Sequence, residues 1–173
     1  ALTHEDADLI QRMFDRGQQV VIKLYMEAET KDSSLSYNVM GELVGTEKPD
    51  EIIAIGGHSG SWDIGSGAHD DASGCFATWK ALKVLKDLNL QPKRTIRAVM
   101  WVNEENGIRG GKEYAIQHKN ENHILMFEFD AGAFPEPTFG IKGSDSVYKK
   151  VKSIEKVLNE FLSAKVRKGA WGI

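Results

Sequence analysis

From residue 51 onward, apolar runs alternate with segments of helical spacing, and this alternation is the feature that most constrains the fold. The apolar runs cover residues 51–57, 94–103 and 123–130, and the helical segments cover residues 72–88, 110–119 and 144–162. Short apolar runs of this kind are typical of strands covered on both faces, and strands that alternate with helices form a largely parallel sheet. Two shorter segments follow. Residues 137–143 fit a short strand or loop, and residues 165–173 fit a final strand. The pattern predicts an α/β fold.

The residues before 51 predict a different arrangement at one edge of this sheet. Residues 20–29 and 34–45 alternate between apolar and polar side chains, as half-buried antiparallel strands do. A helix is expected over residues 6–14, between Thr3 as its N-cap and Gly17 as its stop signal. We therefore expect a mixed sheet with a parallel centre and an antiparallel meander at its edge.

Composition limits the classes of function. A chain of 173 residues is expected to form one domain over residues 1–173. Its net charge of −3 provides no basic surface for nucleic acid or an anionic membrane. No apolar run reaches the roughly 18–20 residues that a membrane span requires. The single cysteine, Cys75, excludes an internal disulfide framework and a metal site built on thiolates.

Polar side chains follow each of the apolar runs. The residues in question are His58, Asn103-Glu104-Glu105 and Asp130 after the three runs, and Asp70-Asp71 just before the helix at 72–88. In an open α/β sheet, functional groups gather beyond the carboxyl ends of the strands. One histidine and five carboxylates are therefore expected to converge on one edge of the sheet.

This convergence favours a bound cation. Carboxylates placed together without a cation repel one another and raise their own pKa values. One imidazole among oxygen ligands suits zinc, cobalt or manganese better than calcium. In the pair Glu104-Glu105, one side chain can bind the metal while the other acts as general base. A structural role remains open for several of these residues, and Asp71 in particular fits a helix N-cap.

A serine nucleophile is the competing interpretation of the stretch Gly57-His58-Ser59-Gly60-Ser61. A nucleophile elbow requires glycine where Ser61 stands, and a helix directly after the serine. Its catalytic triad also requires a histidine after the acid, and no histidine follows His123. The metal-ligand interpretation of His58 is favoured.

Three segments, GGHSGSWDIGSGAHDDASG, VNEENGIRGGKEYA and MFEFDAG, resemble the di-zinc exopeptidases of the aminopeptidase family, most closely its plasma glutamate carboxypeptidase branch. The resemblance extends over nearly the whole chain. It implies a phosphorylase/hydrolase-like three-layer α/β/α sandwich and substrates that are dipeptides or short peptides with a free amino terminus. It also implies a secreted, periplasmic or lysosomal location, whereas the oligomeric state stays open.

The resemblance implies a role for each residue at the sheet edge. The zinc ligands would be His58, Asp70, Glu105 and Asp130. Asp70 would bridge two ions, and Glu104 would be the general base that takes a proton from the attacking water. Asp71 would follow a cis peptide bond that orients Asp70.

Two departures from the family pattern concern the metal. Gly60 stands where the family has an aspartate that supports the histidine, and loss of such a partner typically weakens metal affinity or activity about 10–100-fold. The family also takes a further zinc-binding histidine from a later segment, so at most one well-formed zinc site is expected here. The chain is interpreted as a C-terminally truncated catalytic domain without the accessory protease-associated domain. The alternative hypothesis is a non-catalytic, degenerate or truncated peptidase-like scaffold or binding domain.

Overall fold

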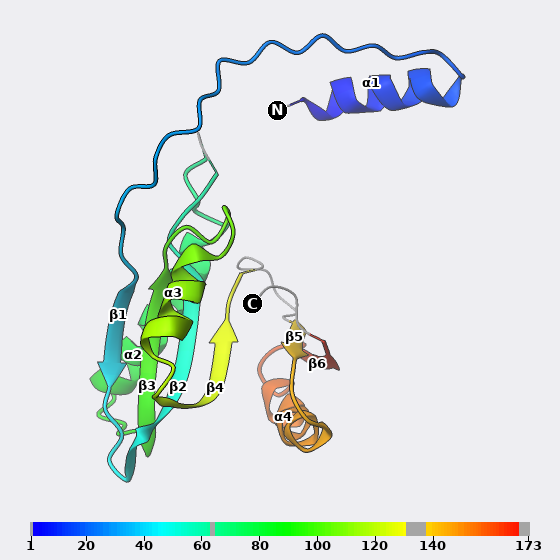
Figure 1. Ribbon diagram of the computed structural model, residues 1–173. Coiled ribbons are helices and arrows are strands. Elements are labelled where there is room, and N and C mark those ends of the chain that lie inside the picture. The colour runs from blue at the N-terminus through cyan, green and yellow to red at the C-terminus, as the bar shows by residue number, and fades with distance from the viewer. Residues whose placement is uncertain (1, 63–64, 131–137, 170–173) are drawn as a thin grey trace. The chain divides into compact units, whose positions relative to one another are not determined.

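The computed structural model describes residues 2–62, 65–130 and 138–169, which fall into two compact units, Ala1–Ser34 and Leu35–Ile173. In the first unit, helix α1 spans His4–Asp15 (Figure 1). Thr3 caps it as predicted, because its Oγ1 accepts a hydrogen bond from Asp6 N at 3.1 Å. Gly17 follows the helix with a φ of +73°, a conformation that glycine adopts without strain.

The predicted strand at residues 20–29 is wrong. These residues form neither helix nor strand, and their apolar side chains, such as Ile22 and Leu24, are exposed. An alternating pattern is stabilised only where a neighbouring strand satisfies the backbone and a core covers the apolar face. The described residues provide no such neighbour for this segment, since no ladder includes it.

The second unit contains a four-stranded mixed sheet in the order β1-β3-β2-β4. Its strands are β1 Val39–Leu43, β2 Lys48–His58, β3 Arg94–Trp101 and β4 Asn122–Glu128. Strand β2 pairs in parallel with both β3 and β4, and β1 pairs antiparallel with β3. The parallel centre and antiparallel edge are confirmed. The expected meander is wrong, because β1 lies beside β3 rather than beside β2, the next strand along the chain.

Helices α2 (Ala72–Asp87) and α3 (Arg109–Gln117) cover opposite faces of the sheet (Figure 1). Successive residues of β3 show this directly. Met100 lines a cavity with Phe76 and Trp79 of α2, whereas the ring of Trp101 lies 5.0 Å from that of Tyr114 in α3. The three-layer arrangement is therefore confirmed.

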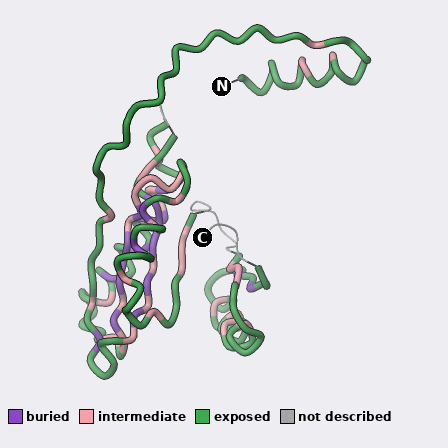
Figure 2. The backbone as a smooth tube through the Cα atoms, in the orientation of Figure 1, coloured by how far each residue is buried: buried purple, intermediate pink, exposed green. Residues whose placement is uncertain are grey.

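The buried residues concentrate in this sheet and under its helices (Figure 2). Val99, Trp101 and Tyr114 form a buried cluster on the α3 face. Beside it lies the buried guanidinium of Arg97, which donates hydrogen bonds to Tyr114 Oη and to Glu121. The buried cluster and the hydrogen bond from Arg97 to Tyr114 thus hold α3 against the sheet.

The remaining elements form a small separate motif. Strands β5 (Thr138–Ile141) and β6 (Lys165–Lys168) pair in parallel, and helix α4 (Asp145–Leu158) connects them. Ser144 caps α4 by accepting a hydrogen bond from Val147 N at 3.3 Å. The predicted helix ends four residues too late, and the last four residues of the predicted final strand lie outside the described residues.

Candidate metal centre

The carboxyl ends of β2, β3 and β4 lie at one edge of the sheet, and the predicted site residues lie there. His58 is the last residue of β2, and its side chain is only 1% exposed. Its Nε2 lies 2.9 Å from Oδ1 of Asp70, which precedes α2, and 3.0 Å from Oδ1 of Asp130, which follows β4. Three chain segments therefore place possible ligand atoms around one nitrogen.

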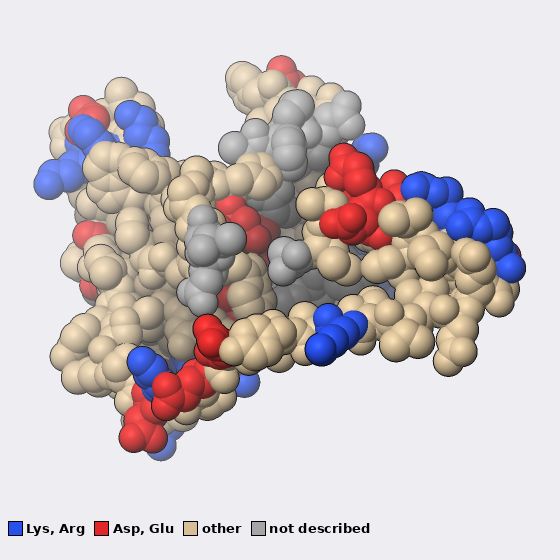
Figure 3. All heavy atoms as spheres, turned by 90° about the horizontal axis from the view of Figure 1, so that it is seen from above, with Lys and Arg blue, Asp and Glu red and all other residues tan. Residues whose placement is uncertain are grey.

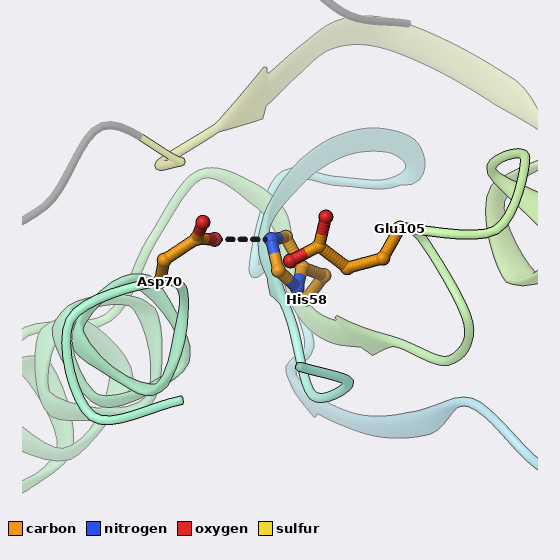
Figure 4. A group of neighbouring side chains, drawn as sticks. All are labelled: His58, Asp70 and Glu105. Atoms are coloured by element: carbon orange, nitrogen blue, oxygen red, sulfur yellow. Dashed lines mark ion pairs between the residues drawn. The ribbon is translucent and has the colours of Figure 1, made fainter. Parts of the chain in front are cut away.

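Glu105 completes this group from the loop after β3. Figure 4 shows the side chains of His58, Asp70 and Glu105 turned toward one another, and one ligand atom from each lies within 4.8 Å of the others. Glu105 Oε1 is buried and has no hydrogen-bond partner among the described residues. A buried carboxylate oxygen without a partner is costly, and a cation would remove that cost. The donor set of one imidazole and several carboxylates fits zinc.

The orientation of His58 is fixed by Gly60. His58 Nδ1 lies 2.9 Å from the main-chain oxygen of Gly60. Because a carbonyl oxygen only accepts, Nδ1 must carry a proton and donate it. When the ring is neutral, Nε2 therefore carries no proton, and its lone pair is available to a cation placed between it and the carboxylates of Asp70 and Asp130. The expected supporting carboxylate is absent at residue 60, but a main-chain carbonyl of the same residue accepts the hydrogen bond.

Asp71 has a structural role at the start of α2. Its Oδ1 accepts a hydrogen bond from Gly74 N at 2.9 Å, and its Oδ2 accepts one from His58 N at 3.0 Å. The first bond confirms the predicted N-cap, and the second links the start of α2 to the end of β2, which carries His58. The Asp70–Asp71 peptide bond is cis, as the resemblance implied. One oxygen of Asp71 also lies within 4.8 Å of ligand atoms of His58 and Asp130, but both of its oxygens already accept hydrogen bonds from backbone N–H groups, which favours the structural role.

Glu104 lies beside these ligands and is half-buried. Burial raises the pKa of Glu104, His58 opposes this rise, and the carboxylates of Asp130 and Glu105 add to it. A carboxylate with a raised pKa holds a proton more readily. The environment of Glu104 therefore suits a general base.

The sequence analysis missed Glu128, the last residue of β4. Burial, together with the nearby carboxylates of Asp130 and Glu104, raises the pKa of Glu128 to about 7. The available signal was an acidic residue inside the apolar run HILMFEFD, two positions before Asp130 and thus on the same side of the strand. The acidic character of this edge is visible in Figure 3, where acidic side chains lie in a hollow among neutral ones.

The model of the family described as peptidase family M28 matches residues 38–168 of the chain. Among curated proteins, Carboxypeptidase Q of Rattus norvegicus is 40% identical over 163 residues, which cover 91% of this chain and 34% of the relative. A probable leucine aminopeptidase 2 of Aspergillus oryzae is 28% identical over 145 residues, covering 82% of this chain and 28% of the relative. The chain thus spans about a third of the length of the curated relatives it matches.

A solved structure supports the same relationship. The crystal structure of a peptidase M28 precursor from Shewanella amazonensis superposes with a TM-score of 0.83 at 38% identity. The match covers 95% of this chain and 38% of that chain. The similarity that the motifs predicted, including the carboxypeptidase branch, is therefore confirmed.

Proposed function

The chain belongs to peptidase family M28, and on that premise we propose that it carries the metal-binding core of a zinc-dependent exopeptidase. Its substrates are dipeptides or short peptides with a free amino terminus. The observation that carries this proposal is the contact of His58 Nε2 with both Asp70 and Asp130, beside a buried Glu105 oxygen that lacks a partner among the described residues.

The residues support one well-formed zinc site. His58, Asp70 and Asp130 would hold the first ion, because their ligand atoms already meet at Nε2. Among the described residues, Asp70 and Glu105 are the ligands that a second ion would have. Two protein ligands are too few for a stable tetrahedral site, which normally has at least three.

When bound, zinc would polarise the scissile carbonyl and lower the pKa of the attacking water. The protein supplies the remaining chemistry. Glu104 takes a proton from the attacking water at a carboxylate oxygen and passes it to the leaving amine. His58 donates its Nδ1–H to the Gly60 carbonyl in a hydrogen bond. This bond fixes the ring, so its Nε2 stays directed at the metal-binding position. Asp71 holds the main chain of His58 through Oδ2.

The charge of the site supports a substrate with a free amino terminus. Acidic side chains gather at the carboxyl edge of the sheet (Figure 3), and the negative potential of such a cluster attracts an ammonium group.

No helix of the described chain is long and apolar enough to cross a membrane. A secreted, periplasmic or lysosomal location is part of this proposal.

The alternative is a peptidase-like scaffold that binds without turnover, and it is favoured by the small number of ligands that the described residues offer a second ion. One experiment separates the two: zinc content of the purified chain, with dipeptide hydrolysis measured before and after zinc addition. We expect about one zinc per chain, as the ligand set supports, and hydrolysis that a chelator abolishes. Zinc binding without hydrolysis would support the scaffold, and no zinc at saturating concentration would exclude the zinc-dependent peptidase.

A further inference from the structure

The loop between β3 and α3 carries Glu104 and Glu105, and the side chain of Asn38 lies at its base. Across this base, Gly110 N donates a hydrogen bond to Val102 O at 2.9 Å. Asn38 directly precedes β1 and bonds the same two residues. Its Oδ1 accepts a hydrogen bond from Val102 N at 2.9 Å, and its Nδ2 donates one to Gly110 O at 2.9 Å. One side chain, 64 residues before Val102 in the sequence, thus ties together the two ends of the loop.

The two partners fix the orientation of this amide, because a main-chain N–H only donates and a carbonyl oxygen only accepts. The packing around it is close. A Cβ placed on Gly110 would lie 2.3 Å from Asn38 Oδ1 and 2.5 Å from Val102 O, closer than real Cβ atoms come. Gly110 is buried, and Asn38 is half-buried. Main-chain polar groups in such a place need partners, and the Asn38 amide supplies one acceptor and one donor.

The loop itself is a compact turn. Gly107 N and Ile108 N both donate hydrogen bonds to Glu104 O, at 2.9 and 2.7 Å. Glu105 Oε1 has no hydrogen-bond partner among the described residues, so no hydrogen bond fixes that oxygen. Its place therefore follows from the main chain of the turn. The turn in turn depends on its two ends, which Asn38 joins.

We propose that Asn38 is a positioning residue for Glu104 and Glu105. By joining Val102 to Gly110, it sets the place of the turn and therefore of the two carboxylates at the carboxyl edge of the sheet. This inference rests on the proposed function, because the roles of both glutamates belong to it. A displacement of a catalytic group by about 1 Å can lower the rate about a hundredfold.

The proposal separates turnover from the binding of the first zinc ion. The ligands of that ion, His58, Asp70 and Asp130, come from β2, from the start of α2 and from the end of β4. The Asn38 side chain bonds none of these segments among its described contacts. Loss of the Asn38 amide should therefore lower kcat and leave the Kd of the first zinc ion unchanged.

Two variants of Asn38 test this separation. Asn38→Leu keeps a similar shape and removes both hydrogen bonds, whereas Asn38→Asp keeps the acceptor for Val102 N but places an oxygen against the Gly110 carbonyl. We expect kcat for dipeptide hydrolysis to fall about tenfold to a hundredfold in Asn38→Leu, with little change in KM. Asn38→Asp should also lower kcat. Circular dichroism shows whether each variant is folded, and Asn38→Asp carries the test if Asn38→Leu is not.

The matched control is Thr95→Val, at the amino end of β3 and thus at the end of the strand away from the site. Thr95 is buried, and its Oγ1 accepts a hydrogen bond from Gly45 N at 3.1 Å and donates one to Pro49 O at 2.7 Å. Thr95→Val therefore also removes one accepted and one donated hydrogen bond to the main chain. It should keep the kcat of the unchanged chain. A kcat in the Asn38 variants equal to that of Thr95→Val would overturn the proposal.

A second readout needs neither zinc nor turnover. Hydrogen exchange, measured by NMR on the metal-free chain, reports how firmly the turn is held at the N–H groups of Gly107 and Ile108. We expect these two groups to exchange about tenfold or more faster in Asn38→Leu than in Thr95→Val or the unchanged chain. If the unchanged chain does not hydrolyse dipeptides, the proposed function fails, and exchange still decides whether Asn38 holds the turn. Equal exchange in Asn38→Leu and Thr95→Val would contradict that role.

Discussion

At the scale of single residues, Glu104 and Glu105 are neighbours in sequence with different surroundings. Glu105 points toward His58 and Asp70, and one of its oxygens is buried without a partner among the described residues (Figure 4). Glu104 lies outside that group of ligand atoms, and burial raises its pKa. The two environments favour a division of labour in which Glu105 binds metal and Glu104 moves a proton.

This division predicts the effects of two conservative substitutions. Glu104→Gln removes the proton acceptor but keeps the shape, so dipeptide hydrolysis should fall about 10²–10⁴-fold, the usual contribution of a general base. Its zinc content should not change. Glu105→Gln is the matched comparison: it should weaken the binding of any zinc beyond the first ion, for which Asp70 and Glu105 would be the ligands, and leave the first ion in place. If Glu104→Gln weakens zinc binding while Glu105→Gln abolishes hydrolysis with all zinc retained, the two roles have been exchanged.

The sequence predicts the candidate site where it depends on strand ends. His58, Asp70, Glu105 and Asp130 were placed at one edge by topology alone, and the structure brings them together. It does not predict contacts that depend on packing. The hydrogen bond from His58 Nδ1 to the Gly60 carbonyl depends on the path of the loop after β2. A loop has no periodic pattern in the sequence from which its path could be predicted.

At the scale of elements, the close approach of α2 to β2 positions the ligands. A Cβ on Gly57 would lie 2.6 Å from both Asp71 Oδ2 and Cys75 N, closer than real Cβ atoms come. The absence of a side chain at Gly57 therefore lets the start of α2 reach the end of the strand. This contact holds Asp71, which in turn binds the main chain of His58.

Gly57→Ala should force these two elements apart. Overpacking of this kind typically costs about 1–3 kcal/mol in the free energy of unfolding, and we also expect weaker zinc binding because Asp71 is displaced. Urea denaturation measures the first effect and chelator competition the second. Gly41→Ala in β1 is the control, since no atom lies within 4 Å of its added Cβ. Equal stability of the two variants would show that the close approach is not required.

The elements themselves could be predicted where burial matches the pattern. The parallel strands β2, β3 and β4 and the helices α2, α3 and α4 all appear within a few residues of their predicted ranges. The strand predicted at residues 20–29 is wrong because alternation only indicates that a segment could lie half-buried in a sheet. The described chain offers this segment neither a core to cover its apolar side nor a partner strand. The sequence does not predict the position of β1 beside β3 either. That position depends on which edge strand of the parallel sheet has a free side for pairing.

At the scale of the molecule, one ion-pair network centred on the buried Arg97 joins the two edge strands of the sheet and helix α3. Arg97 of β3 bonds Glu42 of β1, Tyr114 of α3 and Glu121, which precedes β4. The hydrogen bonds from Arg97 and from His118 lower the pKa of Glu121 to about 2. Because its folded pKa is depressed, Glu121 stabilises the fold above its ordinary pKa of 4.5 and loses that contribution as the pH falls toward 2.

The network therefore predicts a pH dependence of stability. The free energy of unfolding should decrease as the pH falls from about 4.5 to about 2, and Glu121→Gln should make this decrease shallower. Chemical denaturation at a series of pH values measures the slope. Glu160→Gln, at an exposed position of the α4 region, should keep the slope of the unchanged chain. The same slope in both variants would mean that Glu121 does not carry the effect.

The central claim is that one zinc ion binds where β2, α2 and β4 meet. An anomalous difference map, collected at the zinc absorption edge from crystals grown with zinc, locates the ion directly. The account predicts one fully occupied peak, about 2.0–2.2 Å from His58 Nε2 and from carboxylate oxygens of Asp70 and Asp130. A map without a peak between these three residues, with zinc bound elsewhere or not at all, would contradict it.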